Sequence, residues 1–480
     1  MDEKLIFEHT KSGRKGTELP SLYVSSNELM HYIPDAFRRL KDAPLPEVSE
    51  PEVIRHYIRL SQQNFSVDTH FYPLGSCTMK YNPKINEDLA SLNGFTHVHP
   101  YAPCDHVQGI LQIMYELEQY LCALTGMSRF SLQPAAGAHG ELTGMMLVKA
   151  YHDIQGDTKR KKVIVPDSSH GTNPASAALH GFQTVEIKSN RRGRVDLPQL
   201  RDIIDDECAC LMLTNPNTLG LFEDEIVQIA EVVHQRGGLL YYDGANLNAM
   251  MGLCRPSDMG FDIVHLNLHK TFSTPHGGGG PGAGPVGVVK NLVNYLPIPI
   301  VDKKGDEYFL NNSLPHTIGK VKAFYGNIGV LIKAYCYIRS LGLKGLLQAT
   351  KDAIINANYI KNKVRDYYRL PYEGHCMHEF VLSAQDFKQN GIHASDIGKR
   401  LLDYGFHAPT ISFPLIVQEA LMIEPTETES KETLDAFIDA LRRIAEEAKN
   451  NPEIVKNAPH SLHRNRCDEV MAARFPNLCY

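Results

Sequence analysis

Short apolar runs that alternate with helix-like segments constrain the fold of this chain more than any other feature. Between residues 65 and 325, the runs 163–165, 211–213 and 238–242 are almost continuously apolar, and the run 261–268 is mostly apolar. Strands buried on both faces have this pattern, and parallel sheets covered by helices on both sides are built from such strands. The pattern therefore predicts an α/β domain with a mostly parallel sheet.

Changes in pattern along the sequence predict four parts. We expect an N-terminal arm over residues 1–64, a large domain over 65–325, a linker helix with a smaller C-terminal α+β domain over 326–450, and a tail over 451–480. Apolar spacing predicts helices near 107–124, 137–151, 226–236, 321–343, 394–404 and 434–444, the first capped by Asp105, and strands at 379–382 and 420–423.

Composition argues against several classes of function. The formal net charge of −6 and the dispersed lysines and arginines give no reason to expect nucleic acid as a partner. No apolar run reaches the length of a membrane span, and residues 1–7 have neither a signal-peptide nor a transit-peptide pattern, so we expect a cytoplasmic protein. Ten cysteines without a Cys-x-x-Cys pair predict neither a disulfide framework nor a metal site.

Polar loops follow the four apolar runs, after Val165, Leu213, Tyr242 and Leu268. In open parallel sheets, ligands bind beyond the carboxyl ends of the strands. Since all four loops lie at that edge of the predicted sheet, they are expected to form one shared site.

An acid and a lysine stand at two of these strand ends. Asp243 follows the run 238–242 directly, and Lys270 follows the run 261–268. A pyridoxal phosphate enzyme needs this pair, because the lysine amine forms the Schiff base to the cofactor aldehyde and the acid keeps the pyridine nitrogen protonated. The pair therefore predicts pyridoxal 5'-phosphate as the cofactor, with Lys270 and Asp243 as catalytic residues.

Four glycines, Gly277 to Gly280, follow the lysine. They permit positive φ angles and close approach of the backbone to a ligand. The run lacks the Gly-Lys-Ser/Thr order of a nucleotide-binding P-loop and comes after its lysine, so it gives no sign of a nucleotide triphosphate site.

Several segments together resemble one family, glycine decarboxylase, the P-protein of the glycine cleavage system. They are residues 68–82, which include Gly-Ser-Cys-Thr-Met-Lys, residues 133–140, His-Gly-Thr-Asn-Pro-Ala-Ser at 170–176, residues 243–248 and residues 269–282. Residues 6–9 and 318–326 extend the likeness over most of the chain. The short chain is similar to subunit 2 of the two-subunit bacterial form, which carries the lysine.

The resemblance implies a fold, an activity and partners. It implies fold type I of the pyridoxal phosphate enzymes, which is aspartate aminotransferase-like. It also implies an oxidoreductase that decarboxylates glycine, releases CO₂ and transfers the aminomethyl group to the lipoyl arm of the H-protein. The expected partners are a homologous subunit 1, in an α₂β₂ heterotetramer, and a transiently bound H-protein.

Further site residues are expected around the cofactor. Gly137, Ala138 and His139 begin a helix whose unpaired N–H groups are suited to the cofactor phosphate, although a small-residue helix packed on a sheet has the same pattern. The resemblance implies that the His170 ring packs on the pyridine ring, where the alternative is a loop histidine. Thr218 is a candidate to bind the cofactor's phenolic oxygen or the substrate, or only to shape its loop.

The remaining candidates are less specific. Asn246 has the same alternatives as Thr218, His276 is a candidate for the phosphate, and His269 is a candidate for proton transfer unless strand alternation turns it away. The resemblance implies that Ser76, Cys77 and Thr78 lie near the substrate, while Cys77 also fits a buried, small apolar position.

Two other functions remain open at this level. Another fold type I enzyme, such as an aminotransferase or a cysteine desulfurase, would share Lys270 and Asp243 but lack the segments at 75–80 and 170–176. A non-catalytic scaffold subunit would have no need for either residue. CO₂ release from glycine and a visible cofactor band would separate these alternatives.

Overall fold

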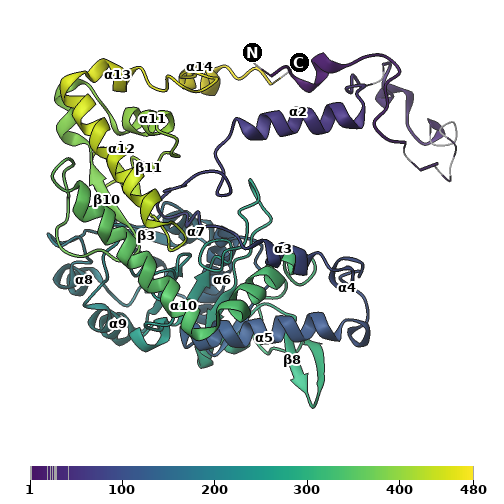
Figure 1. Cartoon of the computed structure of the whole chain (residues 1–480). Helices are drawn as coiled ribbons and strands as arrows, with labels where there is room; N and C mark the ends of the chain where they lie inside the picture. The colour runs from purple at the N-terminus through teal and green to yellow at the C-terminus, as the bar shows by residue number, and fades with distance from the viewer. Residues whose placement is uncertain are drawn as a thin grey trace. The chain divides into compact units, whose positions relative to one another are not determined.

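The computed structural model describes residues 3–18, 20–21, 23, 25, 30–41 and 43–478. It contains two compact units, one formed by residues 67–460 and the other by residues 1–66 with 461–480. The larger unit holds a seven-stranded sheet, a three-stranded sheet and a two-stranded hairpin (Figure 1).

The seven-stranded sheet has the order β1-β7-β6-β5-β4-β2-β3. Strands β6, β5, β4, β2 and β3 are parallel, and β7 runs antiparallel to both β6 and β1. The bounds are β1 Arg129–Ser131, β2 Lys162–Pro166, β3 Gln183–Ile187, β4 Cys208–Leu213, β5 Leu239–Gly244, β6 Ile263–Leu266 and β7 Val286–Val288. The expected mostly parallel sheet is present, with one antiparallel strand near an edge.

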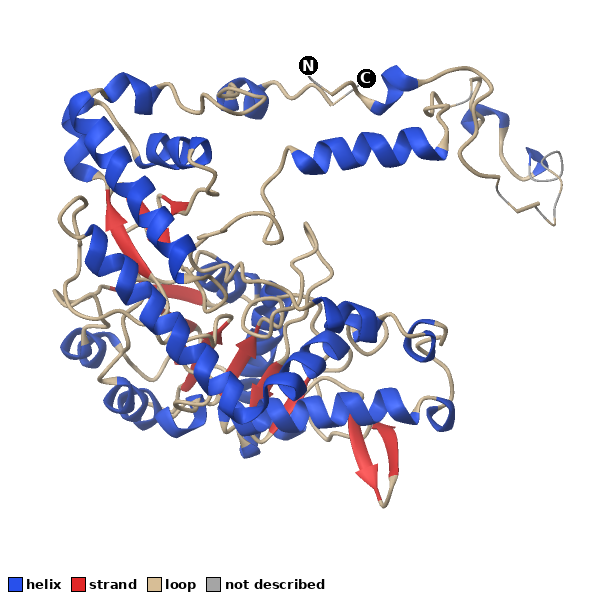
Figure 2. Cartoon of the chain, viewed as in Figure 1, coloured by secondary structure: helices blue, strands red, loops and turns tan. Residues whose placement is uncertain are grey.

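The central strands β4, β5 and β6 are buried on both faces, which explains the continuous apolar runs, and Figure 2 shows helices around the sheet. In β4, Leu211 and Leu213 belong to one core cluster, whereas Cys210 and Met212 belong to another. Successive side chains of a strand point to opposite faces, so a strand covered on both sides is apolar throughout. The helices of this part are α5 Gln108–Thr125, α6 Gly137–Ile154, α7 Thr172–Leu179, α8 Leu197–Ile203 and α9 Ile226–Gln235.

The N-cap expected at Asp105 is wrong. Asp105 lies in the short 3₁₀ helix Cys104–His106, and Val107 precedes the first residue of α5 without a side-chain cap. The antiparallel hairpin of β8 (Ile300–Lys304) and β9 (Glu307–Asn311) lies against α5 (Figure 1) and was not expected from the sequence.

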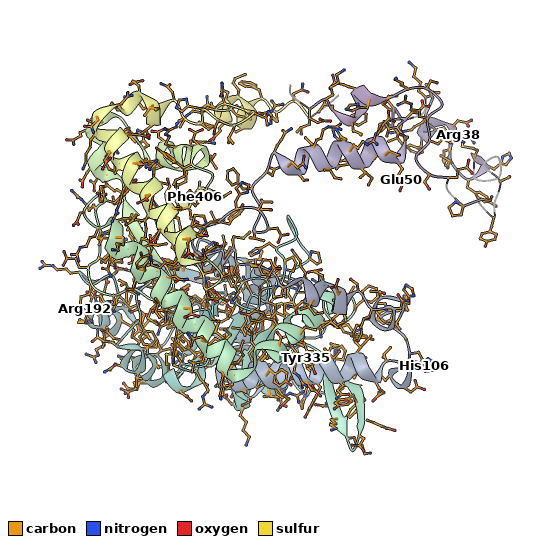
Figure 3. The ribbon with its side chains drawn as sticks, in the orientation of Figure 1. Arg38, Glu50, His106, Arg192, Tyr335 and Phe406 are labelled. Carbon is orange, nitrogen blue, oxygen red and sulfur yellow. The ribbon has the colours of Figure 1, made fainter. Side chains whose placement is uncertain are left out.

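A smaller antiparallel sheet of β10 (Phe380–Ser383), β12 (Ala420–Ile423) and β11 (Thr410–Ile411) occupies the C-terminal part of this unit. It shares a core with α11 (Ala394–Asp403) and α12 (Lys431–Asn450). The rings of Phe71 and Phe406 meet the Phe437 ring of α12 edge-on, with centroids 5.0 and 5.2 Å from the Phe437 centroid. Figure 3 labels Phe406 beside the yellow ribbon of α12. This segment therefore has its own apolar core.

The helix α10, Ile328–Val364, connects the two sheets. It breaks at Gly342, whose φ of 59° and ψ of 179° are not helical. The predicted helix end near residue 343 falls at this break, after which the helix continues. Shorter helices of the unit are α3 Lys84–Ala90, α4 Asn93–Thr96 and α13 Pro452–Lys456, with 3₁₀ turns at Pro256–Met259, Lys290–Tyr295 and Gln385–Asn390.

The second unit contains α2 (Glu50–Gln62), α14 (Glu469–Arg474) and 3₁₀ turns at Ile6–His9 and Asp35–Phe37. Glu3 accepts hydrogen bonds from Arg59 at 2.7 Å and lies 2.9 Å from His56 Nδ1. Several large apolar side chains of this unit are exposed, among them Tyr32, Phe37 and Leu40. Within the described residues of the chain, no helix is both long and apolar enough to cross a membrane.

Candidate active site

A cavity of about 170 Å³ lies at the carboxyl ends of β4, β5 and β6. Its wall includes Thr214 and Thr218 after β4, Asp243 at the end of β5, and Lys270 after β6. The polar loops expected to converge therefore do so, because parallel neighbouring strands bring their carboxyl ends to the same edge.

Asp243 is buried in this cavity and holds its charge through several contacts. Its Oδ2 accepts a hydrogen bond from Asn173 Nδ2 at 3.0 Å, its Oδ1 accepts one from Ala245 N–H at 3.1 Å, and His265 Nε2 lies 3.3 Å from Oδ1. Burial acts to raise the pKa of Asp243, but His265, Asn173 and Lys270 outweigh it, and the pKa is lower than usual. Asp243 is therefore a carboxylate at neutral pH.

A chain of polar side chains continues behind Asp243. Tyr241 Oη lies 2.8 Å from His265 Nδ1, and both residues are buried in neighbouring strands. On the other side, Glu141 Oε2 accepts hydrogen bonds from Asn173 Nδ2 at 3.0 Å and Thr172 Oγ1 at 2.9 Å. Burial and the charge of Asp243 raise the pKa of Glu141 to about 7.

The start of α6 reaches the cavity at Gly137 and Ala138. A Cβ on Gly137 would lie 2.3 Å from the Asn267 side chain, so a larger residue here would displace that side chain. Ala136, the N-cap, makes no side-chain cap bond, and the first N–H groups of a helix lack intrahelical acceptors. This end of α6 can hold an anionic group.

The cavity meets the requirements of pyridoxal phosphate. It combines a lysine, a buried carboxylate and a helix start without bulky side chains. Glu141 Oε1 and Asn267 Oδ1 are buried without a hydrogen-bond partner, and both residues line the cavity. A polar ligand in the cavity can form hydrogen bonds with these two oxygen atoms.

The predicted residues His170, Thr218 and Asn246 also line the cavity. His170 Nδ1 lies 2.8 Å from Thr172 Oγ1, and burial lowers the pKa of His170. Thr218 Oγ1 donates to the Ser168 carbonyl at 2.5 Å, and Asn246 Nδ2 donates to Glu424 Oε1 at 2.9 Å. The Thr218 and Asn246 side chains therefore already form hydrogen bonds within the protein.

The loop after Gly75 lies at another wall. Ser76 lines the cavity and donates its N–H to Glu379 Oε2 at 2.8 Å. Thr78 is buried behind it and donates to Glu424 from both its N–H and its hydroxyl. Burial raises the pKa of the Cys77 thiol, and Cys77 does not line the cavity.

Three predicted histidines do not line the cavity. His139 Nδ1 accepts a hydrogen bond from Ala135 N–H at 3.1 Å, so its side chain closes the turn before α6. His276 Nε2 lies 3.0 Å from the Cys77 carbonyl. His269 packs edge-on against His276. Burial, and to a smaller extent the charge of His276, lower the pKa of His269 to about 4.

The sequence reasoning missed several residues of the site, among them Glu141, Asn173, His265, His378, Glu379 and Glu424. A histidine inside the apolar run 261–268 was a signal for His265, and an acid next to each small-sheet strand was a signal for Glu379 and Glu424. Neither signal shows by itself that these strands meet the cavity.

Comparisons with known proteins agree with this architecture. A family model described as glycine cleavage system P-protein matches residues 14–309, and one described as glycine dehydrogenase, C-terminal domain, matches residues 349–464. A protein from Caldanaerobacter subterraneus subsp. tengcongensis, named probable glycine dehydrogenase (decarboxylating) subunit 2, is 62% identical over 98% of this chain and 97% of its own. A protein of the same name from Bacillus cytotoxicus is 57% identical over 100% of this chain and 98% of its own.

The chain belongs to the glycine cleavage system P-protein family. The family predicted from the motifs is therefore confirmed. The P-protein match includes Asp243 and Lys270, and the C-terminal match includes Glu379 and Glu424.

Solved structures confirm the fold of this P-protein family member. An inhibitor-bound glycine decarboxylase (P-protein) of the glycine cleavage system has a TM-score of 0.74 at 22% identity, covering 88% of this chain and 95% of that one. A cysteine desulfurase from Escherichia coli has a TM-score of 0.61 at 14% identity, covering 81% and 98%. Fold type I, the fold class predicted for the chain, is therefore correct.

Proposed function

We propose that this chain catalyses pyridoxal-phosphate-dependent decarboxylation of glycine and transfers the aminomethyl group to the lipoyl disulfide of the H-protein. The observation that carries the proposal is the shared cavity of Lys270 and Asp243 beside the open start of α6. Family membership supports glycine as the substrate.

The cofactor, when bound, supplies an electron sink for the charge left when CO₂ departs. Lys270 Nζ is the group that would hold it covalently, and Asp243 would keep a proton on its ring nitrogen. The N–H groups at Gly137 and Ala138 would hold its phosphate, and the His170 ring would lie against its face. Thr218, Asn246 and Ser76 would border the substrate, and Cys77 and Thr78 would support Ser76 from behind.

Assembly and location are part of the proposal. The relatives are named as subunit 2, which supports a homologous subunit 1 as the partner, and we propose an α₂β₂ heterotetramer. The H-protein would bind transiently, because its arm must leave after each transfer. We also propose a cytoplasmic location, in keeping with relatives that are bacterial proteins.

Exchange of labelled CO₂ into glycine tests the proposal. We expect exchange when the chain is combined with pyridoxal phosphate, subunit 1 and a lipoylated carrier, and loss of exchange with Lys270→Ala. Lys149→Ala is a matched control, because Lys149 lies on α6 and does not line the cavity. A complex with no exchange and no visible cofactor band would support the scaffold alternative instead.

A further inference from the structure

Three buried titratable side chains form the part of the cavity wall that comes from the small sheet. His378 and Glu379 precede β10, and Glu424 follows β12, which pairs with β10. One ring nitrogen and two carboxylate oxygens of these residues lie within 4.8 Å of one another. His378 and Glu379 line the cavity, and all three residues are at most 4% exposed. Nothing in the proposed decarboxylation uses them.

The hydrogen bonds of the two carboxyl groups differ. Glu424 accepts three bonds, from Thr78 N–H at 3.0 Å, Thr78 Oγ1 at 2.8 Å and Asn246 Nδ2 at 2.9 Å. Glu379 accepts one, from Ser76 N–H at 2.8 Å. Donors stabilise a carboxylate, so the negative charge of the pair resides on Glu424. Two carboxylates this close do not both ionise readily, so Glu379 carries the proton.

Burial also raises the pKa of Glu424, but its hydrogen bonds from Asn246 and Thr78 and the charge of Lys270 oppose this rise. Burial, and then the charge of Glu424, raise the pKa of Glu379 well above its ordinary value, although Lys270 acts in the opposite direction. Burial, and then Lys270, lower the pKa of His378 to about 3, so this ring is neutral. The thiols of Cys77 and Cys376 also interact electrostatically with Glu379, and burial raises the pKa of both thiols.

The transfer half of the proposed function needs one proton. When the aminomethyl carbon forms its bond to one sulfur, the disulfide S–S bond breaks and the second sulfur leaves with the electron pair. The disulfide is reduced, CO₂ is the oxidised product, and the leaving sulfur becomes a thiol only by taking up a proton. An acid in the cavity wall can supply this proton directly at the place where the sulfur is released.

We propose that Glu379 is the general acid that protonates the released sulfur, and that Glu424 is the positioning residue that keeps the proton on Glu379. The inference rests on the proposed function, because it assumes a disulfide carrier. It assigns a separate task to each side of the cavity. The large sheet supports loss of CO₂, and the small sheet supplies the proton for transfer.

Rapid-quench measurement of one turnover tests this assignment. The complete complex with pyridoxal phosphate and subunit 1 is mixed with labelled glycine and lipoamide disulfide, and CO₂ and thiol are measured together. In Glu379→Gln, thiol formation should fall about 100-fold, the usual size of a lost general acid, and fall further than CO₂ release. Glu379→Asp should restore part of the rate.

Glu429→Gln is the matched control. Burial raises the pKa of Glu429 to about 7, yet this residue does not line the cavity. Its substitution should leave both rates unchanged. Infrared spectra of the cofactor-free chain give a second readout, since Glu379→Gln should remove one protonated-carboxyl band that persists in Glu429→Gln.

The pH dependence distinguishes a proton donor from a structural residue. In Glu424→Gln, Glu379 loses its negative neighbour, so its pKa falls and the alkaline limb of thiol formation moves to lower pH. The inference is overturned if the alkaline limb of thiol formation does not move in Glu424→Gln. It is also overturned if Glu379→Gln slows CO₂ release and thiol formation equally. A stoichiometric divalent metal bound in the purified complex and absent from Glu379→Gln would overturn it too. A wild-type complex that releases no CO₂ overturns the proposed function as well.

Discussion

Asp243 keeps a negative charge in a site where burial opposes it. Asn173, His265 and the Ala245 N–H stabilise this charge, and each has a nitrogen within 3.3 Å of a carboxylate oxygen of Asp243. Charge-assisted hydrogen bonds of this kind are stronger than neutral ones. A carboxylate fixed in this way is suited to hold a proton on a heterocyclic nitrogen.

Replacing Asp243 with Asn should retain the cofactor and remove most of the decarboxylation, because a neutral amide no longer favours a protonated pyridine ring. Loss of one ionic hydrogen bond weakens cofactor binding by about 1.5–3 kcal/mol, so the assay needs saturating cofactor. CO₂ release from glycine and cofactor absorbance measure the two effects. Near-normal turnover in this variant would contradict the role of Asp243.

Borohydride reduction of the cofactor-loaded chain, followed by peptide mapping, should place the pyridoxyl label on Lys270. Lys80 is an internal control, because it is buried and pairs with Glu427 at 2.6 Å. Burial acts to lower the pKa of Lys80, but Glu427 outweighs it and the pKa rises, which keeps this amine protonated and unreactive. Label on Lys80 or another lysine would disprove the assignment.

Glu223 predicts a pH dependence of stability. It is buried under the loop at Asn217, and burial raises its pKa from 4.5 to about 7. The folded state therefore holds this proton more tightly than the unfolded state, so the free energy of unfolding falls as pH rises from 4.5 to about 7. Urea unfolding of Glu223→Gln across this range should show a shallower slope, whereas Glu231→Gln, on an exposed position of α9, should match wild type.

At the scale of elements, α12 holds the small sheet in place. Phe437 is fully buried and meets Phe71 and Phe406, which come from segments far apart in the sequence. Phe437→Ala should lower the free energy of unfolding by about 3–5 kcal/mol, because it leaves a cavity in this core. Leu415→Ala, at an 84% exposed position, should change it by less than about 0.5 kcal/mol in the same urea titration.

The central strands could be predicted because burial on both faces leaves a continuous apolar run. Strand β3 could not, because it lies at the edge of the sheet and its residues Gln183–Ile187 are mostly not buried. The short strands β1 and β7 have three residues each, too few to show a period. Asp243 and Lys270 were found because each ends an apolar run, whereas the meeting of Glu379 with Glu424 depends on pairing of β10 with β12.

At the scale of the whole molecule, exposed apolar side chains suggest a partner surface. Tyr23, Tyr32, Phe37, Leu40 and Leu45 are each at least 74% exposed in the unit that contains residues 1–66. Apolar side chains gathered on one segment are typical of an interaction surface. The arm is therefore the part of the chain that we expect to bind subunit 1.

Co-expression of both subunits should give one four-chain species by light scattering. Deleting residues 1–45 should increase its dissociation, because the exposed apolar side chains of the arm are lost. Deleting only residues 476–480 is a control that leaves this segment intact. A monomeric chain with full glycine–CO₂ exchange would contradict the assembly.

The bonds between Thr78 and Glu424 join residues 346 positions apart. A ribosome releases Thr78 long before Glu424. The central sheet can thus form during synthesis, while the cavity stays open on one side until β12 has emerged. We therefore expect nascent chains that stop before β12 to be unable to retain pyridoxal phosphate, so that cofactor loading requires synthesis of the small sheet.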